Sequence, residues 1–241
     1  MNTEPELRPL GVDGILVRFS RFLTDEANAQ ALAFRDRLAS AGITGVTEVA
    51  SSLTSVRVGF DPSKTTRDTV GKAIQSLATE RALQDTSPKR LWHIPACFGP
   101  EHAPQLAEAA ALAGLSVDQA IAEITAQETR VIAIGFAPGQ AYQGMLPDHW
   151  DIPRQSALTE SLPRGALITA VRQLIIWAAD APTGWRHIGQ TAFRVYQPDT
   201  PTPFAFEPGD RVRFHAVPDS AFADIRADST TNGGARCEVL R

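Results

Sequence analysis

Residues 134–147 read IGFAPGQAYQGMLP, a loop that continues the apolar, strand-like run TRVIAIGF (129–136). Three glycines and two prolines punctuate the loop, and it contains no charged side chain. Glycine permits a positive φ or a close backbone approach and proline fixes φ, so these residues predict a constrained turn. Backbone N–H groups in such a loop can bind a carboxylate or an oxyanion, although a plain crossover between strands needs the same residue types.

The sequence after the loop lacks helical periodicity and consists of short apolar runs separated by glycine and proline. These runs are GALITAV (165–171), LIIWAA (174–179), WRHIGQTAFRVY (185–196) and DRVRFHAV (210–217). The pattern is typical of a compact β barrel or sandwich. EPGD (207–210) predicts a turn before the last clear strand, and residues 219–241 are interpreted as a flexible C-terminal tail.

The sequence before the loop alternates strands and helices. The pattern predicts strands at 14–19, 46–52 and 55–60, and helices at 24–42, with Thr24 as the N-cap, and at 65–83. This order predicts a split βαβ, ferredoxin-like subdomain over residues 1–88, with DTSPK (85–89) as the linker. LWHIPACF (91–98) is either its last strand or the bridge to a barrel domain over residues 89–218. Two further helices are expected at 103–127, the second beginning with a capping-box spacing at Ser116 and Gln119. The fold class is therefore α+β.

The composition excludes several classes of partner. The hydrophobic fraction is 43%, the charged fraction 21% and the formal net charge −4, without a long basic run. Nucleic acid and anionic membranes therefore lack electrostatic support. No apolar run approaches the roughly 20 residues that span a bilayer, and the N-terminus lacks the core of a signal peptide, so a cytoplasmic protein is expected. Cys97 and Cys237 lie too far apart in sequence to predict a disulfide framework or a metal site.

Several side chains have both a functional and a structural interpretation. Arg154 follows a proline soon after the loop and can clamp a carboxylate, or can be a solvated surface residue. Gln173 lies between apolar runs, where an amide is a structural hydrogen-bonding group or a substrate contact. Tyr142 and Trp185 can be core or rim aromatics, or the walls of a pocket.

The histidines and cysteines give weaker indications of a site. His93 and Cys97 lie four apart and share a face of a predicted strand, but roughly 13 Å of strand separates them. Cys97 is therefore expected to be a buried core residue rather than half of a nucleophilic pair. His187 has no partner that the sequence can identify, and a lone histidine is usually structural.

Nine fragments, in order along the chain, together resemble one protein family. IPACFGPE (94–101) resembles its IPVCYGGE, GLSVDQAI (114–121) its GLSVEEVI, and IGFAPGQAYQGMLP its IGFLPGFAYLGGLP. PRQ (153–155) resembles the family's PRR, and LPRGAL (162–167) resembles its VPAGSV. APTGWRHIGQT (181–191) resembles its SPGGWQLIGRT, and EPGDRVRF (207–214) resembles its closing PGDRVRF. RPLGVDGILVRF (8–19) and SSLTSVRVGFDP (51–62) also fit. The chain is thereby similar to the B component of the bacterial ATP-dependent 5-oxoprolinase. That family is also labelled allophanate hydrolase subunit 1, or carboxyltransferase domain, subdomain C and D, and it includes the sporulation kinase inhibitor.

The resemblance implies an N-terminal α+β subdomain, a C-terminal cyclophilin-like β barrel and a hydrolase complex. The C component of the enzyme, with a related barrel, and its A component would be the partners, and together they would cleave 5-oxoproline to glutamate. ATP would be bound by the complex, and no cofactor intrinsic to this chain is expected. Arg154 with the loop amides would hold a carboxylate or a phosphorylated lactam, and Gln173 would orient it. The other matched positions, expected to bind substrate, are Gly135, Phe136, Pro138, Gly139, Tyr142, Trp185 and Gly189.

The sequence also departs from the family pattern. Gln140 replaces an aromatic residue and Gln155 replaces the second arginine of PRR. Val171 and Ile175 replace glycines, so they are expected to fill space and to exclude positive φ. The chain is thus expected to be a divergent form of the B component.

Two alternatives stay open at this point. One is an allophanate hydrolase or urea carboxylase-related carboxyltransferase subunit. The other is a regulatory, kinase-inhibitor-like binding protein, which would need an exposed apolar patch around Ile175, Ile176 and Trp177.

Overall fold

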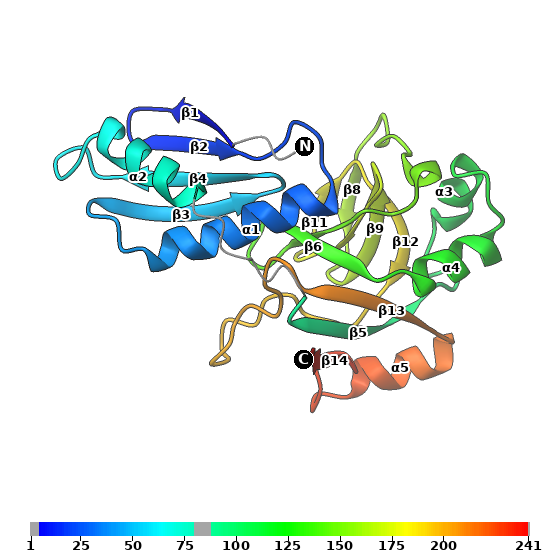
Figure 1. Cartoon of the computed structure of the whole chain (residues 1–241). Coiled ribbons are helices and arrows are strands. Elements are labelled where there is room, and N and C mark those ends of the chain that lie inside the picture. Colours follow the sequence, from blue (N-terminus) through cyan, green and yellow to red (C-terminus); the bar gives the residue numbers. More distant parts are fainter. Residues whose placement is uncertain (1–4, 80–87, 241) are drawn as a thin grey trace. The chain divides into compact units, whose positions relative to one another are not determined.

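The computed structural model describes residues 5–79 and 88–240, which belong to two compact units, residues 1–87 and 88–241 (Figure 1). None of the helices within the described ranges is long and apolar enough to span a bilayer. The predicted linker at 85–89 falls mostly outside the described residues.

The first unit is a four-stranded antiparallel sheet with two helices. Its elements are β1 (Glu6–Leu10), β2 (Gly14–Arg18), α1 (Asp25–Ser40), β3 (Val46–Ser52), β4 (Ser55–Phe60) and α2 (Arg67–Thr79). The strand order β1-β2-β4-β3 places β4 between β2 and β3, which confirms the split βαβ arrangement. Thr24 caps α1 as expected, because its Oγ1 accepts a hydrogen bond from the Ala27 N–H (3.1 Å).

The fourth strand of this sheet is β1, from the N-terminal segment, which was not expected to be a strand. β1 forms a hairpin with β2, with Glu6 opposite Arg18, and their side chains form an ion pair. The sequence did not predict β1, because ELRPL is polar and carries a proline, which only an edge strand tolerates. The run 91–98 therefore does not complete this sheet but starts the next unit. Side chains from both helices and the sheet form the core: Ile15, Val17, Phe34, Leu38, Val56, Val58, Val70 and Ile74.

The second unit is a β barrel with helices. It begins with β5 (Arg90–Cys97), α3 (Leu106–Leu112), α4 (Val117–Ala126), β6 (Thr129–Ile134), β7 (Ala141–Gly144) and the 3-10 helix η1 (Asp148–Trp150). It continues with β8 (Thr159–Leu162), β9 (Ala166–Ala170), β10 (Gln173–Ile176), β11 (Ala181–Thr183), β12 (Arg186–Gln190), β13 (Arg211–Val217), α5 (Asp219–Ala227) and β14 (Arg236–Val239). The two expected helices at 103–127 are α3 and α4, and α4 begins with a capping box at Ser116 and Gln119.

The barrel closes because β5 contacts three other strands. The sheet order β12-β9-β10-β7-β6-β13-β5 returns to its start through the pairing of Gln190 with Cys97. β13 runs parallel to β5 over seven residue pairs, from Arg211–Leu91 to Val217–Cys97. The N-terminal half of β5, residues 90–93, pairs with β14. This closure confirms the α+β class with a C-terminal barrel.

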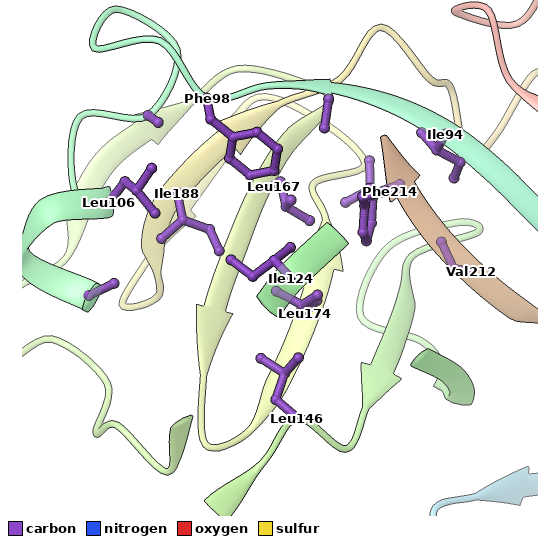
Figure 2. Packing of buried hydrophobic residues seen from close by; sticks show 14 of the residues in the cluster. Ile94, Phe98, Leu106, Ile124, Leu146, Leu167, Leu174, Ile188, Val212 and Phe214 are labelled. Carbon is purple, nitrogen blue, oxygen red and sulfur yellow. The ribbon is translucent and has the colours of Figure 1, made fainter. Parts of the chain in front are cut away.

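Apolar side chains from every strand of the closed wall meet in one cluster (Figure 2). Labelled members are Ile94, Phe98, Leu106, Ile124, Leu146, Leu167, Leu174, Ile188, Val212 and Phe214. Alternate residues of a strand face opposite sides of a sheet. Ile168 and Ile175 accordingly belong to a second cluster, with Leu162 of the small β8–β11 sheet. The barrel interior is therefore filled with side chains, and one outer face of its wall is also covered.

The apolar patch required by the regulatory alternative is absent from the described surface. Ile175 and Ile176 are each 1% exposed and Trp177 is 4% exposed. Ile176 packs into the barrel interior, and the other two pack into the covered outer face. The expectation of an exposed patch there is wrong, because both faces of this strand pack against hydrophobic clusters.

The expectation that Val171 excludes positive φ is also wrong. Val171 has φ +45 and Arg172 has φ +64, and the two form the two-residue turn between β9 and β10. Such a turn needs positive φ at both central residues. The turn is anchored from outside, since the Arg172 Nε–H donates to the Leu146 carbonyl (2.8 Å) and its Nη1 pairs with Asp148 (2.7 Å). Ile175 does fill space, as expected.

Residues 219–240 form an ordered end of the barrel unit, unlike the flexible tail expected from the sequence. Phe222 of α5 is buried, and β14 pairs residue by residue with β5 from Arg236–His93 to Val239–Arg90. The loop between them is fixed to the barrel by Asn232, whose side chain accepts from the Arg194 N–H (2.8 Å) and donates to the Arg194 carbonyl (3.0 Å). The sequence did not predict this order, because a single buried residue such as Phe222 in a polar segment gives no periodic pattern.

Candidate functional site

The loop between β6 and β7, residues 135–140, is a tight turn closed by its own backbone. The Gly135 N–H donates to the Gln140 carbonyl (3.0 Å), and the Gln140 N–H donates to the Ala137 carbonyl (3.1 Å). Gly139 has φ +73, and a Cβ at this position would lie 2.5 Å from the Val195 carbonyl oxygen. The turn is thus wedged against the segment after β12, and two of its amides already have partners within the turn.

Phe136 is the exposed aromatic residue of this loop. Its side chain is 75% exposed, its φ is +76, and its ring stacks on Trp177 with centroids 5.5 Å apart. A left-handed conformation costs a non-glycine residue about 1–2 kcal/mol, and such strain clusters at functional positions. Phe136 therefore offers an aromatic surface to solvent, supported from behind by Trp177.

Arg154, Tyr142 and Trp185 are brought together by the fold. The Arg154 guanidinium carbon lies 5.5 Å from the centroid of the Trp185 ring, and the Tyr142 ring meets that ring edge-on at 6.1 Å. Gln155 fixes the backbone beside them, because its N–H donates to the Gly184 carbonyl (2.7 Å) and its Nε2 donates to the Trp185 carbonyl (2.9 Å). Arg154 is thus an exposed cation above an aromatic ring, and its expected role as a carboxylate clamp stays a prediction.

The other predicted residues are distributed over different parts of the barrel. Gln173 begins β10 next to the strained turn, and its backbone carbonyl accepts the Thr169 hydroxyl (2.9 Å). Gly189 of β12 lies against the end of the paired strand β5, since a Cβ there would lie 3.1 Å from the Phe98 ring. Pro138 is exposed in the loop. The predicted residues therefore form two aromatic groupings and several separate positions.

A polar cavity of about 410 Å³ lies elsewhere on the barrel unit. Three arginines and one glutamate give it an excess of positive charge. Its charged and polar lining consists of Glu101, His102, Arg164, His187, Gln190, Thr191, Arg194 and Arg226. Clustered guanidinium groups bind carboxylates and phosphates through paired hydrogen bonds, so this cavity suits a small anion.

Three of the fragments that carry the family resemblance converge on this cavity. Glu101 ends IPACFGPE, Arg164 belongs to LPRGAL, and Gln190 belongs to APTGWRHIGQT. The second and third are joined at Gly165, which has φ +83 and accepts hydrogen bonds from the Thr191 N–H (2.8 Å) and hydroxyl (3.0 Å). The Gln190 Nε2 also donates to the Arg164 carbonyl (2.8 Å). These bonds hold the cavity wall in place.

The C-terminal elements complete the cavity. Arg226 lies in the last turn of α5, with its guanidinium carbon 5.9 Å from the centroid of the Phe222 ring. The backbone of Arg194, from which its side chain reaches the cavity, is held by Asn232 from the loop before β14. Two of the three cationic side chains therefore depend on the segment that the sequence predicted to be a flexible tail.

His187 is the buried titratable residue of the cavity. It is 7% exposed, and its backbone N–H donates to the Gln105 side-chain oxygen (2.9 Å). Burial is the main cause that lowers the pKa of His187; hydrogen bonding with Gly189 and Gln190 opposes it, and the nearby His102 adds to it. Within residues 5–79 and 88–240, its Nε2 has no hydrogen-bond partner. The lowered pKa favours a neutral imidazole, and its Nε2 is shielded from solvent within the cavity wall.

The sequence did not single out this cavity as a site. Arg164, Arg194 and Arg226 belong to exposed stretches in which an arginine is ordinarily a solvated residue. His187 was noted, but as a lone histidine. The one indication was that Arg164, His187 and Gln190 fall inside resemblance fragments, since fragments distant in sequence that share a family pattern often share a site.

Comparison with known proteins places the chain in one set of relatives. The family model described as carboxyltransferase domain, subdomain C and D, matches residues 5–206. A Bacillus subtilis (strain 168) protein named as the B component of 5-oxoprolinase is 25% identical over 239 residues, covering 95% of this chain and 100% of the relative. An Escherichia coli O157:H7 protein of the same name is 30% identical over 154 residues, covering 64% of this chain and 70% of the relative.

Solved structures agree with this grouping. The crystal structure of TTHA0988 superposes with a TM-score of 0.74 at 27% identity over 88% of this chain, which spans only 40% of the TTHA0988 chain. The K. lactis urea amidolyase gives a TM-score of 0.77 at 16% identity over 98% of this chain and 16% of its own, a likeness of fold alone. The architecture described above is thus also found inside longer chains.

Proposed function

The chain belongs to the carboxyltransferase domain family, subdomain C and D, and on that premise we propose that it is the B-type component of a 5-oxoprolinase complex. The complex would open the ring of 5-oxoproline to glutamate with the hydrolysis of ATP. We assign ATP binding to the complex rather than to this chain alone. The proposed partners are a C-type barrel protein and an A-type protein of the same complex, and the proposed compartment is the cytoplasm.

The observation that carries this proposal is the arginine-lined cavity built from three resemblance fragments. 5-Oxoproline carries a carboxylate beside its lactam ring, and glutamate carries two. Arg164, Arg194 and Arg226 would hold such a carboxylate by charge-assisted hydrogen bonds. His187, buried in the cavity wall, would border the neutral part of the ligand. In this arrangement the chain binds and orients the substrate, which is a contribution of proximity to the reaction.

The roles expected for Arg154 and Gln173 stay predictions within the same proposal. Arg154 and Phe136 belong to the outer aromatic face of the barrel, where a partner protein could contact both. Gln173 lies at the β9–β10 turn, which Arg172 ties to η1. Neither residue lines the arginine-lined cavity. We therefore propose the cavity as the substrate site and the aromatic face as a partner contact.

Reconstitution tests the proposal directly. The chain is combined with the A-type and C-type proteins from the same source, and glutamate formed from 5-oxoproline is measured with and without ATP. We expect ATP-dependent release that requires all three proteins. Failure to form glutamate with folded partners that bind one another would contradict the proposed function, and hydrolysis of allophanate instead would favour the carboxyltransferase-related alternative.

Variants of the cavity test the binding role. Arg194→Ala and Arg164→Ala should raise the KM for 5-oxoproline about tenfold or more each, because each removes a charge-assisted hydrogen bond. Arg21→Ala, an exposed arginine of the first unit, is the matched control and should leave KM unchanged. If the cavity variants keep the wild-type KM, the substrate binds elsewhere.

A further inference from the structure

Three potential metal ligands meet where β5 ends and α5 begins. Cys97 is the last residue of β5, His102 lies in the turn after it, and Asp219 is the first residue of α5. The Cys97 Sγ lies 3.0 Å from the Asp219 Oδ1, and the His102 Nε2 lies 3.8 Å from the same oxygen. One ligand atom from each residue falls within 4.8 Å of the other two.

We propose that Cys97, His102 and Asp219 form a binding site for a divalent transition metal, with Zn²⁺ as the best fit, and leave a fourth coordination position open. Thiolate, imidazole and carboxylate are the three side-chain ligands that Zn²⁺ takes. Three protein ligands with one open position is the arrangement of catalytic rather than structural zinc sites. The sequence did not predict a metal site because Asp219 lies far along the chain from Cys97.

The observed spacing is close to that of a metal-bound set. Zinc bonds of about 2.0–2.3 Å in a tetrahedron place ligand atoms roughly 3.5 Å apart. The distances of 3.0 and 3.8 Å bracket this value and the third pair lies within 4.8 Å, so shifts of about an ångström would suffice.

The surrounding backbone preorganises the three ligands. A Cβ at Gly99 would lie 2.5 Å from the Asp219 Oδ1, so only glycine leaves room for this carboxylate. The His102 N–H donates to the Gly99 carbonyl (2.9 Å), and the His102 ring packs edge-on against Phe222 at 4.9 Å. The thiol is buried and the histidine is mostly covered, while the carboxylate remains open to solvent.

A nucleophilic cysteine is the competing interpretation of these residues, and the electrostatics disfavour it. Burial raises the pKa of the Cys97 thiol, the hydrogen bond to Asp219 raises it further, and the Gly99 backbone opposes both. A reactive cysteine needs a lowered pKa. A bound dication would satisfy thiolate and carboxylate together and release the thiol proton to solvent.

The open coordination position would be reachable from two sides. His102 also lines the arginine-lined cavity, while Cys97, Gly99 and Asp219 line a second cavity of about 360 Å³. The position could take a water molecule or an anionic oxygen of a ligand held in the first cavity. Metal binding itself does not depend on the hydrolase function proposed above.

Cobalt titration of the chelator-treated full chain tests the site. We expect one Co²⁺ per chain, with the visible bands of tetrahedral cobalt and a thiolate-to-cobalt charge-transfer band, and we expect Zn²⁺ to displace it. Cys97→Ser and His102→Gln should weaken Zn²⁺ binding at least about 100-fold, more than the loss of a ligand's supporting partner costs. Cys237→Ser, which removes the exposed cysteine, is the matched control and should leave the spectrum and affinity unchanged.

Two outcomes would overturn the proposal. One is a wild-type spectrum without the thiolate band, and the other is equal Zn²⁺ affinity in Cys97→Ser. Far-ultraviolet circular dichroism checks that the variants fold. If they do not, alkylation of Cys97 in the Cys237→Ser protein decides, because Zn²⁺ must slow its modification by a maleimide, and an unchanged rate would contradict the site.

Discussion

The Arg90 guanidinium holds the Asp210 carboxylate through two hydrogen bonds, Nε to Oδ1 at 2.8 Å and Nη2 to Oδ2 at 2.6 Å. Asp210 is only 4% exposed, and its Oδ2 also accepts from the Trp92 indole (3.2 Å) and the Glu207 N–H (2.9 Å). Hydrogen bonding to Asp210 also raises the pKa of Arg90. One carboxylate thus joins the start of β5 to the turn that begins β13.

Asp210→Asn should destabilise the barrel unit by about 2 kcal/mol, because it removes the bidentate carboxylate of a largely buried guanidinium and leaves only the exposed Glu207, at 3.4 Å, as a counter-charge. Urea unfolding monitored by tryptophan fluorescence measures this, since the tryptophans lie in the second unit. Asp199→Asn, at an exposed position, is the control and should change stability by less than about 0.5 kcal/mol. A loss no larger than that of the control would mean that this ion pair contributes little.

Substitution by alanine should destabilise the protein at one glycine of the β6–β7 loop and leave its stability unchanged at another. Gly139→Ala combines a positive φ with a contact of 2.5 Å to the Val195 carbonyl, and should cost at least about 2 kcal/mol. Gly135→Ala meets nothing within 4 Å and should stay within about 0.5 kcal/mol of the wild type. Thermal unfolding of the two proteins side by side gives the comparison, and equal losses would show that the loop is not wedged as described.

Phe136→Ala should weaken binding to a partner protein while leaving the stability of the chain nearly unchanged. Because the ring is 75% exposed, its loss should change the unfolding free energy by less than about 1 kcal/mol. As an aromatic anchor for a partner, the same ring should contribute about 2 kcal/mol to complex formation, or roughly 30-fold in Kd. Calorimetric titration with the C-type protein measures the affinity, with Phe22→Ala, an exposed aromatic residue of the first unit, as the control. Unchanged affinity would remove Phe136 from the interface.

The stability of the barrel unit should fall as the pH drops below about 6.5. His187 has an ordinary pKa of 6.5, lowered in the folded protein first by burial. Between the folded and unfolded pKa values the unfolded chain binds more protons, so acid favours unfolding and the contribution is complete only above the unfolded pKa. His215, whose pKa is also lowered by burial, contributes in the same direction. His187→Gln should flatten this pH dependence in urea unfolding between pH 7 and pH 5, and an unchanged slope would contradict the assignment.

The β3–β4 turn provides a stabilising prediction. Leu53 has φ +52 in the two-residue connection between paired Ser52 and Ser55. Leu53→Asn should raise the stability of the first unit by about 1 kcal/mol, because asparagine tolerates the left-handed region that leucine does not. Hydrogen exchange of the first-unit amides reports this locally, and no gain in protection would show that the turn is unstrained in solution.

Local patterns were enough to predict much of the fold. The α1 helix begins at the expected cap, and the order β2-α1-β3-β4-α2 follows from periodicity and turn residues. The capping box at Ser116 and the barrel strands after residue 129 were also predicted. These features depend on residues within a few positions of one another, which a sequence shows directly.

The failures share a physical cause, because each depends on contacts between distant segments. β1 is a strand only because β2 offers an edge, and α5 is fixed only because Phe222 finds a core. Val171 adopts positive φ because Arg172 and η1 hold the turn from outside. The cavity arginines come from three stretches that meet only after the barrel closes. No local pattern contains these contacts.

The neighbours of β5 also govern how this chain can fold as it is synthesised. The first strand of the barrel has no partner until β12, β13 and β14 have been made, the nearest of them about ninety residues later. The first unit, whose contacts are local, can fold while the rest is still on the ribosome. The barrel must instead wait with an apolar strand exposed, and such distant pairings fold slowly. Of the two units, the barrel should therefore be the one that depends on chaperones and the one that aggregates when the chain is truncated.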